Sequence, residues 1–356
     1  MEMKGIKGDL QEVSSKRYIS QVQKLWGTFR SIYSGSAEEL PKWEQGIVLQ
    51  FLCEMPDEIK KLLGEVHWGH KGDKSLSTST QRNYYNSILG FMRGSPIIPV
   101  GFIDDYKEAI KFYTEERDKL GEILSEHIAS HKKDEGEESN WITLEEYDAV
   151  IEKIEKENDD SNRWLKDYSC LFDDSELPPR KKSGLITDLL GVQNEILLYL
   201  YRHQPPARND YAGMEITTAK EMRKKENIEL GENRLVIRAK GAWNFHFGEY
   251  KTKKNHGITR VDVNKKVQKK LRKWLDLNKS RFLLLNRDLK PLSRNNLTKR
   301  LTGIFQKELG KSVGSCMMRH IFVSQNAEKI KEIESNAEAM MHSVPQNIKY
   351  VKYNAL

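Results

Sequence analysis

Two segments near the end of the chain carry the most information: Gly314–Ser324 reads GSCMMRHIFVS, and Met340–Tyr350 reads MMHSVPQNIKY. The first contains an arginine, Arg319, within an apolar run. The second contains His342 followed eight residues later by a tyrosine. Arginine and histidine can bind phosphate oxygens, and tyrosine can act as a nucleophile. Taken alone, His342 would be an ordinary histidine at a helix end, stabilised there by the helix dipole. The significance of His342 therefore depends on the other basic residues and tyrosines that accompany it in the sequence.

The sequence around these segments predicts a mostly helical domain with a small antiparallel sheet. Apolar residues at helical spacing predict an apolar core helix over Leu185–Tyr201, after a loop over Asp173–Ser183. Alternating apolar and polar residues predict strands over Arg234–Lys240, Asn244–Tyr250 and Ile258–Val263. Further helices are predicted over Val267–Leu277, Arg294–Leu309, Ser315–Lys329 and Ile333–His342.

Charge is divided unevenly between the two halves of the chain. Residues 1–180 carry 24 Lys and Arg against 35 Asp and Glu, whereas residues 181–356 carry 35 against 17. The basic excess is densest over Lys251–Arg300, with 17 basic and 3 acidic side chains. Such a field favours a polyanion, most simply double-stranded DNA, through neutralisation of phosphates. The candidate DNA contacts are Lys253, Lys254, Arg260, Arg294, Lys299 and Arg300.

The first third of the chain also predicts helices. They are expected over Ser15–Tyr33, around Ile47–Leu52 and Ile59–Val66, over the segment ending at Gly94, and over Asp104–Ser130. The polar segment 132–140 predicts a linker, which gives a helical N-terminal domain over 1–131 and a second domain over 141–356. Thr143 and Glu146 predict a capping box at the start of the next helix.

Several classes of protein are excluded by what the sequence lacks. No apolar run approaches the roughly 20 residues needed to span a bilayer, and the first residues lack the apolar core of a signal peptide. Three cysteines are too few and too scattered for a disulfide framework or a zinc site. There is no glycine-rich phosphate loop, GxSxG elbow or HExxH helix. The expectation is an intracellular protein without a cofactor or metal and without a membrane partner.

Five residues fall in a suggestive order: Arg208 after the apolar helix, Lys251 on a hairpin, then Arg319, His342 and Tyr350. MMRHIFVS resembles the LRHxFAT box of the tyrosine recombinases, or phage integrases, and MMHSVPQNIKY resembles their LGHSSxxxTxxxY box. The resemblance covers about residues 141–356. More weakly, STSTQRNYYNSILGFMR resembles a helix of the family's core-binding domain. The segments RNDY and YKTKK and the helix with Arg319 and His320 resemble those of recombinases of large DNA viruses and their mobile elements.

The resemblance implies a chemistry and a role for each residue. In the family a tyrosine hydroxyl attacks a DNA phosphodiester, which gives a 3′-phosphotyrosyl link and a free 5′-hydroxyl. By resemblance Tyr350 is the nucleophile, Arg208 and Arg319 clamp the phosphate, and His342 binds a nonbridging oxygen. Lys251 is the general acid for the leaving 5′-oxygen. Neither metal nor ATP is needed in this scheme.

Some positions depart from the family pattern. The residue three before Arg319, commonly His or Lys, is Cys316, for which Ser315 or His320 could compensate. The acidic residue expected three positions after the first arginine is Asp210, two positions after it. Lys253 is a rival general acid.

Alternatives therefore stay open. Tyr353 is a rival nucleophile, and Arg208 could simply pair with Glu215 on the surface. His320, Met317, Met318 and Cys316 could be core residues. Little chain follows Tyr350 to form the C-terminal helix that many members dock into a neighbouring protomer.

The function implied is a site-specific DNA recombinase of the integrase or excisionase type. The family implies a clamp around DNA and a dimer to tetramer on it, in the cytoplasm or nucleus of a host or in a virion. Alternatives are a type IB topoisomerase, a hairpin telomere resolvase, or a DNA-binding protein that has lost cleavage.

Overall fold

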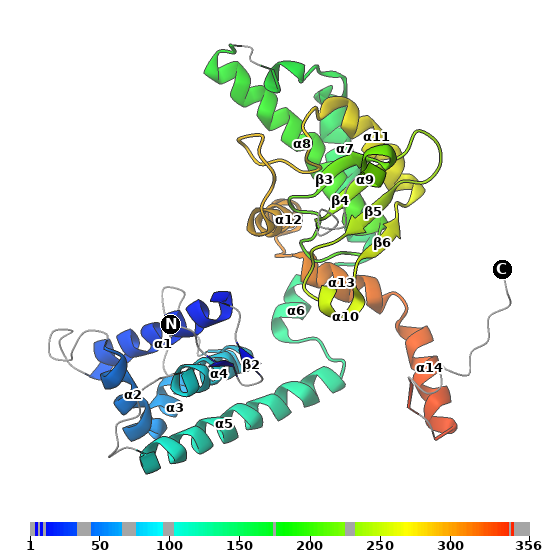
Figure 1. Ribbon diagram of the computed structural model, residues 1–356. Coiled ribbons are helices and arrows are strands. Elements are labelled where there is room, and N and C mark those ends of the chain that lie inside the picture. Colours follow the sequence, from blue (N-terminus) through cyan, green and yellow to red (C-terminus); the bar gives the residue numbers. More distant parts are fainter. Residues whose placement is uncertain are drawn as a thin grey trace. The chain divides into compact units, whose positions relative to one another are not determined.

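The computed structural model describes residues 4–5, 8–9, 12–33, 44–65, 76–94, 103–173, 176–224, 232–341 and 343–344. The chain divides into two compact units, Met1–Lys132 and Lys133–Leu356, each with its own hydrophobic core (Figure 1). The predicted class, mainly helical with a small sheet, is confirmed.

The first unit packs its helices around an aromatic core. Its elements are β1 (Lys4–Gly5), β2 (Gly8–Asp9), α1 (Glu12–Tyr33), α2 (Gln45–Glu54), α3 (Pro56–Glu65), α4 (Thr78–Gly94) and α5 (Ile103–Ala129). The rings of Trp26 and Phe29 both lie against Phe51, with centroids 5.1 and 4.4 Å from it. The buried Tyr113 hydroxyl of α5 donates a hydrogen bond to the Leu52 carbonyl of α2, at 2.7 Å. The five helices that apolar spacing predicted here are confirmed.

The second unit contains the sheet. Its elements are α6 (Glu135–Asn140), α7 (Leu144–Asp160), the short 3₁₀ helices η2 (Arg163–Leu165) and η3 (Ser169–Leu171), α8 (Pro179–His203), β3 (Glu215–Thr218), α9 (Ala219–Lys224), β4 (Arg234–Ile237), β5 (Asn244–Phe247), α10 (Lys253–His256), β6 (Thr259–Asp262), α11 (Lys265–Leu277), α12 (Arg294–Leu309), α13 (Ser315–Ser324) and α14 (Ala327–Ala339).

The sheet is mixed, so the prediction of an antiparallel sheet is corrected. β4, β5 and β6 pair antiparallel as predicted, but β3 pairs parallel to β4, with Glu215 opposite Arg234. The strand EITT is four residues long and alternates only weakly, which is why its sequence gives no strand signal. The β5–β6 hairpin carries Lys251 and the short helix α10 at its end.

Several element boundaries also differ from prediction, for example that of α14, which begins at Ala327 instead of Ile333. α8 begins at Pro179, within the predicted loop, because proline suits the first turn of a helix while the following basic residues carry no apolar period. Segment 132–140, predicted as a linker, contains α6, which Asp134 and Glu137 cap reciprocally. The helix predicted over Ser315–Lys329 ends at Ser324. The capping box of Thr143 and Glu146 is confirmed.

α8 forms the centre of the second core. Its Leu189, Ile196 and Leu200 are buried, and α7, α11 and α12 all contact it. Within the described ranges, no helix is both long and apolar enough to cross a membrane.

Candidate functional site

The loop after α8 presents Arg208 and is fixed from several sides. The Tyr201 hydroxyl of α8 donates to the Arg208 carbonyl. The next residue, Asn209, donates to Thr298 Oγ1 of α12 at 2.7 Å and accepts from Ser315 Oγ of α13 at 2.8 Å. The backbone of Arg208 is therefore held between three helices, while its side chain is half-buried. Glu215 pairs with Arg281 and Arg234 instead, so an ion pair with Arg208 is not observed.

Arg319 lies one turn along α13 from Ser315. The hydrogen bond between Ser315 and Asn209 therefore connects the helix that carries Arg319 to the Arg208 loop. Its Nη2 lies 3.5 Å from Cys316 Sγ. Its Nε is buried and hydrogen-bonds no described residue. No carboxylate among the described residues forms an ion pair with Arg319, which leaves its guanidinium group able to receive an anion.

Asp210 lies among the positive charges of the site. Burial raises the pKa of its carboxyl group, and the charges of Arg294, Arg208 and Arg319 oppose that rise. Arg294 Nη2 donates to Asp210 Oδ1 at 3.2 Å. Both predicted clamp arginines thus influence the pKa of one carboxyl group.

The hairpin that carries Lys251 is joined to this loop. Arg294 Nη2 also donates to the Glu249 carbonyl at 3.2 Å, two residues before Lys251. Asn233 Nδ2 donates to the Asp210 and Glu249 carbonyls at 3.0 and 2.9 Å, and its Oδ1 accepts from the Gly248 and Glu249 amides. Asn233 was not predicted, because a single asparagine between two strands gives no sequence signal.

The two candidate general acids differ in their surroundings. Lys251 is exposed and forms no ion pair with any residue that the structure describes. Lys253 Nζ lies 3.9 Å from Glu249 Oε2. The Tyr250 hydroxyl closes the hairpin by donating to the Gly257 carbonyl at 2.7 Å. The lysine without a carboxylate partner is the better placed of the two to approach a phosphodiester.

The predicted DNA contacts lie on three elements. Lys254 of α10, Arg260 of β6 and Lys299 of α12 are exposed. Arg294 is half-exposed but takes part in the Asp210 contact. Arg300 lies deeper than these residues, because its guanidinium group turns into the protein and donates to Asn194 Oδ1 and the Leu190 carbonyl.

The two side chains that could compensate for a cysteine at position 316 are otherwise engaged. Ser315 donates to Asn209, and His320 Nδ1 lies 3.0 Å from Glu137 Oε1 of α6. His320 and Cys316 are both exposed, so the alternative that placed them in the core is wrong. Met318 is buried as expected, and Met317 packs against the core.

Three predicted residues, His342, Tyr350 and Tyr353, lie outside the described residues. In the part of the chain that the structure describes, no three His, Cys, Asp or Glu side chains are grouped so that they could hold a metal ion.

Comparison with known proteins finds similar solved structures, two of which have low identity and low TM-scores. No protein-family model matches the chain, and no curated protein matches it. A post-cleavage complex of XerH site-specific recombinase bound to palindromic difH substrate is 15% identical, at a TM-score of 0.39, over 92% of this chain and 74% of that one. A pre-cleavage complex of XerH with difH is 14% identical, at a TM-score of 0.32, over 99% and 96%.

Proposed function

We propose that this protein is a tyrosine-type DNA strand-breaking and rejoining enzyme that acts as a site-specific recombinase. The observation that carries the proposal is the set of hydrogen bonds around the Arg208 loop: Asn209 bonds Ser315, one turn from Arg319, and Arg294 joins Asp210 to the hairpin of Lys251. The sequence supplies the remaining groups, His342 and Tyr350, in the order that the resemblance implies.

The proposed mechanism divides the work among these groups. Arg208 and Arg319 hold the nonbridging oxygens of the scissile phosphate and stabilise the charge that grows there in the transition state. His342 donates to the same oxygens. The Tyr350 hydroxyl loses its proton to solvent water as its oxygen attacks phosphorus, and the bond to the 5′-oxygen breaks while Lys251 gives that oxygen a proton. Rejoining reverses these steps, so the energy of the phosphodiester is kept in the phosphotyrosyl bond.

Double-stranded DNA is the proposed substrate, and a dimer to tetramer on DNA is the proposed assembly. The excess of 35 basic over 17 acidic side chains in residues 181–356 supports a polyanion as the partner. The exposed side chains of Lys254, Arg260 and Lys299 extend the positive surface beyond the arginine pair.

Covalent trapping on DNA tests this function. Wild type, Tyr350→Phe and Tyr353→Phe are incubated with nicked fragments of source DNA in EDTA, then denatured, and protein-linked DNA is recovered. We expect an adduct with wild type and Tyr353→Phe that is lost in Tyr350→Phe. If the adduct is lost only in Tyr353→Phe, the nucleophile is Tyr353 and not Tyr350. If Arg319→Ala forms as much adduct as wild type, the proposed role of Arg319 in holding the phosphate is wrong.

A second candidate is a DNA-binding protein that has lost cleavage. It is favoured by the engagement of both residues that could compensate for Cys316: Ser315 with Asn209 and His320 with Glu137. In that case the same fragments are bound tightly by all three proteins, and none forms an adduct. Relaxation of supercoiled plasmid without sequence preference would indicate a type IB topoisomerase, and closed hairpin ends would indicate a telomere resolvase.

A further inference from the structure

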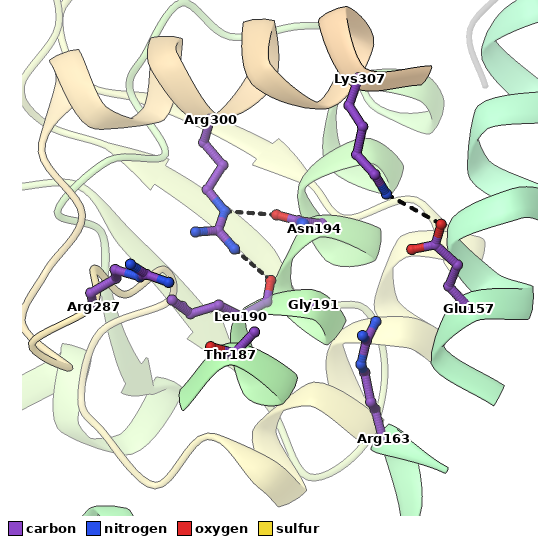
Figure 2. Close-up of a pocket in the computed structure, with 9 residues that line it drawn as sticks. All are labelled: Glu157, Arg163, Thr187, Leu190, Gly191, Asn194, Arg287, Arg300 and Lys307. Carbon is purple, nitrogen blue, oxygen red and sulfur yellow. Dashed lines mark hydrogen bonds and ion pairs between the residues drawn. The ribbon is translucent and has the colours of Figure 1, made fainter. Parts of the chain in front are cut away.

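A second cluster of basic side chains surrounds a pocket of about 230 Å³. Figure 2 shows its lining, in which Arg300 and Lys307 extend from α12 over one face of α8. Arg163 of η2 and Arg287, in the turn before α12, complete a set of four cations. The lining includes a single carboxylate, Glu157. None of these side chains takes part in the arginine pair at Asp210.

Two of the four cations are already neutralised. Arg163 Nε lies 3.2 Å from Asp188 Oδ1, and its Nη1 donates to Asn158 Oδ1 at 3.0 Å. Lys307 Nζ lies 3.3 Å from Glu157 Oε1 and also contacts Glu308 of its own helix. These pairs fix the walls of the pocket.

The other two cations lack a carboxylate partner within the described residues. Arg300 donates only to neutral oxygens, from Nε to Asn194 Oδ1 at 2.6 Å and from Nη2 to the Leu190 carbonyl at 2.7 Å. Burial, reinforced by the charge of Arg287, lowers the pKa of Arg300 to about 10. Arg287 is exposed and no described residue forms an ion pair with it. Two positive charges therefore line the same pocket, and no described carboxylate pairs with either of them.

A glycine in the lining of the pocket leaves room for Arg163. Thr187, Gly191 and Asn194 lie on one face of α8, at positions i, i+4 and i+7. A Cβ at Gly191 would lie 2.9 Å from Nη1 of Arg163, so any larger residue would displace that guanidinium group. Because Gly191 lacks a side chain, Arg163 can lie flat against the helix at the pocket wall.

We propose that this pocket binds a phosphate group between Arg287 and Arg300. Guanidinium groups bind phosphate oxygens through two parallel hydrogen bonds. A free phosphate dianion would neutralise both unpaired charges, and a DNA phosphodiester, which is a monoanion, would neutralise one of them. A volume of about 230 Å³ is several times that of one water molecule, so a phosphate group fits with solvent beside it. The occupant is either free phosphate or a backbone phosphate of DNA. The site does not depend on the proposed strand transfer.

Isothermal titration of the full chain with sodium phosphate, against sodium chloride at equal ionic strength, tests the site. We expect saturable binding by wild type that Arg287→Gln weakens about tenfold or more, because one guanidinium fork is removed. Arg287 is exposed and contacts no other described side chain in an ion pair, so this variant should fold, which circular dichroism would verify. Lys290→Gln is the matched control, since Lys290 is exposed in the same turn but does not line the pocket.

The outcomes separate the two sources of phosphate. If a short DNA duplex displaces inorganic phosphate, the occupant is the DNA backbone; if both bind together, it is a free anion. The absence of saturable binding, or equal binding by Arg287→Gln and wild type, would overturn the site. A chain that binds phosphate here but forms no tyrosine adduct would overturn only the proposed function.

Discussion

At the scale of single residues, Asn233 joins two segments of the candidate site. It is nearly buried and makes four hydrogen bonds to backbone groups of the Arg208 loop and the Lys251 hairpin. Its amide nitrogen donates to carbonyls of both segments, and its amide oxygen accepts from two backbone amides of the hairpin. We regard it as a positioning residue, because it touches no reacting atom in the proposed mechanism.

We therefore expect Asn233→Ala to lower the free energy of unfolding by about 2–3 kcal/mol, since buried backbone groups lose their partners. We also expect the rate of DNA cleavage to fall more than DNA affinity does. Urea unfolding and the rate of adduct formation would measure the two effects. Asn255→Ala, on the exposed surface of α10, is the control. Equal losses of rate and affinity would contradict a positioning role.

The cysteines give a second prediction at this scale. Burial, with the nearby charges of Asp105 and Glu54, raises the pKa of Cys53 to about 11, whereas Cys316 is exposed beside Arg319. Iodoacetamide at about pH 8 should modify Cys316 at least about tenfold faster than Cys53, because the thiolate is the reactive form. DNA that occupies the proposed site should protect Cys316 and leave Cys170 unchanged. Equal modification of Cys316 with and without bound DNA would place the DNA elsewhere.

At the scale of elements, one lysine joins three helices of the second unit. Lys270 of α11 lies 2.6 Å from Glu155 of α7 and also contacts Glu195 of α8, which is 0% exposed. Glu195 further accepts hydrogen bonds from Trp164 and Asn158. This network fixes α8, and therefore the Arg208 loop at its end.

Lys270→Met should lower the free energy of unfolding by about 3–5 kcal/mol, because it leaves the Glu195 charge buried without its cation. Lys269→Met, exposed on the same helix, should change it by less than about 0.5 kcal/mol. Denaturant unfolding of both variants provides the comparison. If the two variants lose equal stability, Lys270 is not the link between these helices.

The elements also show which parts of the fold could be predicted. Arg294–Leu309 was predicted to the residue, because Ser293 caps the helix, Gly310 ends it, and apolar residues recur between them. β3 and the first turn of α8 were missed, since neither has an apolar period. Arg208, Lys251 and Arg319 were predicted as site residues from their order in the sequence, and their roles stay predictions. Asn233 and the pocket around Arg300 depend on tertiary contacts between residues far apart in the chain, which no local pattern records.

At the scale of the whole molecule, the uneven charge predicts how DNA binding responds to salt. Binding through phosphate contacts should weaken about 10³-fold or more between about 50 and 200 mM salt, provided that six or more phosphates are neutralised. Lys299→Gln should reduce the slope of log affinity against log salt by about 0.9, because one exposed cation no longer neutralises a phosphate. Fluorescence anisotropy with a labelled duplex measures both. An unchanged slope would remove Lys299 from the interface.

The chemical identity of the protein–DNA linkage tests the central claim most directly. Adduct formed in EDTA is digested with nuclease and trypsin and analysed by mass spectrometry. Cleavage after Lys349 and Lys352 places Tyr350 and Tyr353 in different peptides, so the modified tyrosine can be assigned. We predict a nucleotide joined through its 3′-phosphate to Tyr350. Tightly bound DNA without any covalent linkage, or a linkage through a 5′-phosphate, would contradict the proposed chemistry.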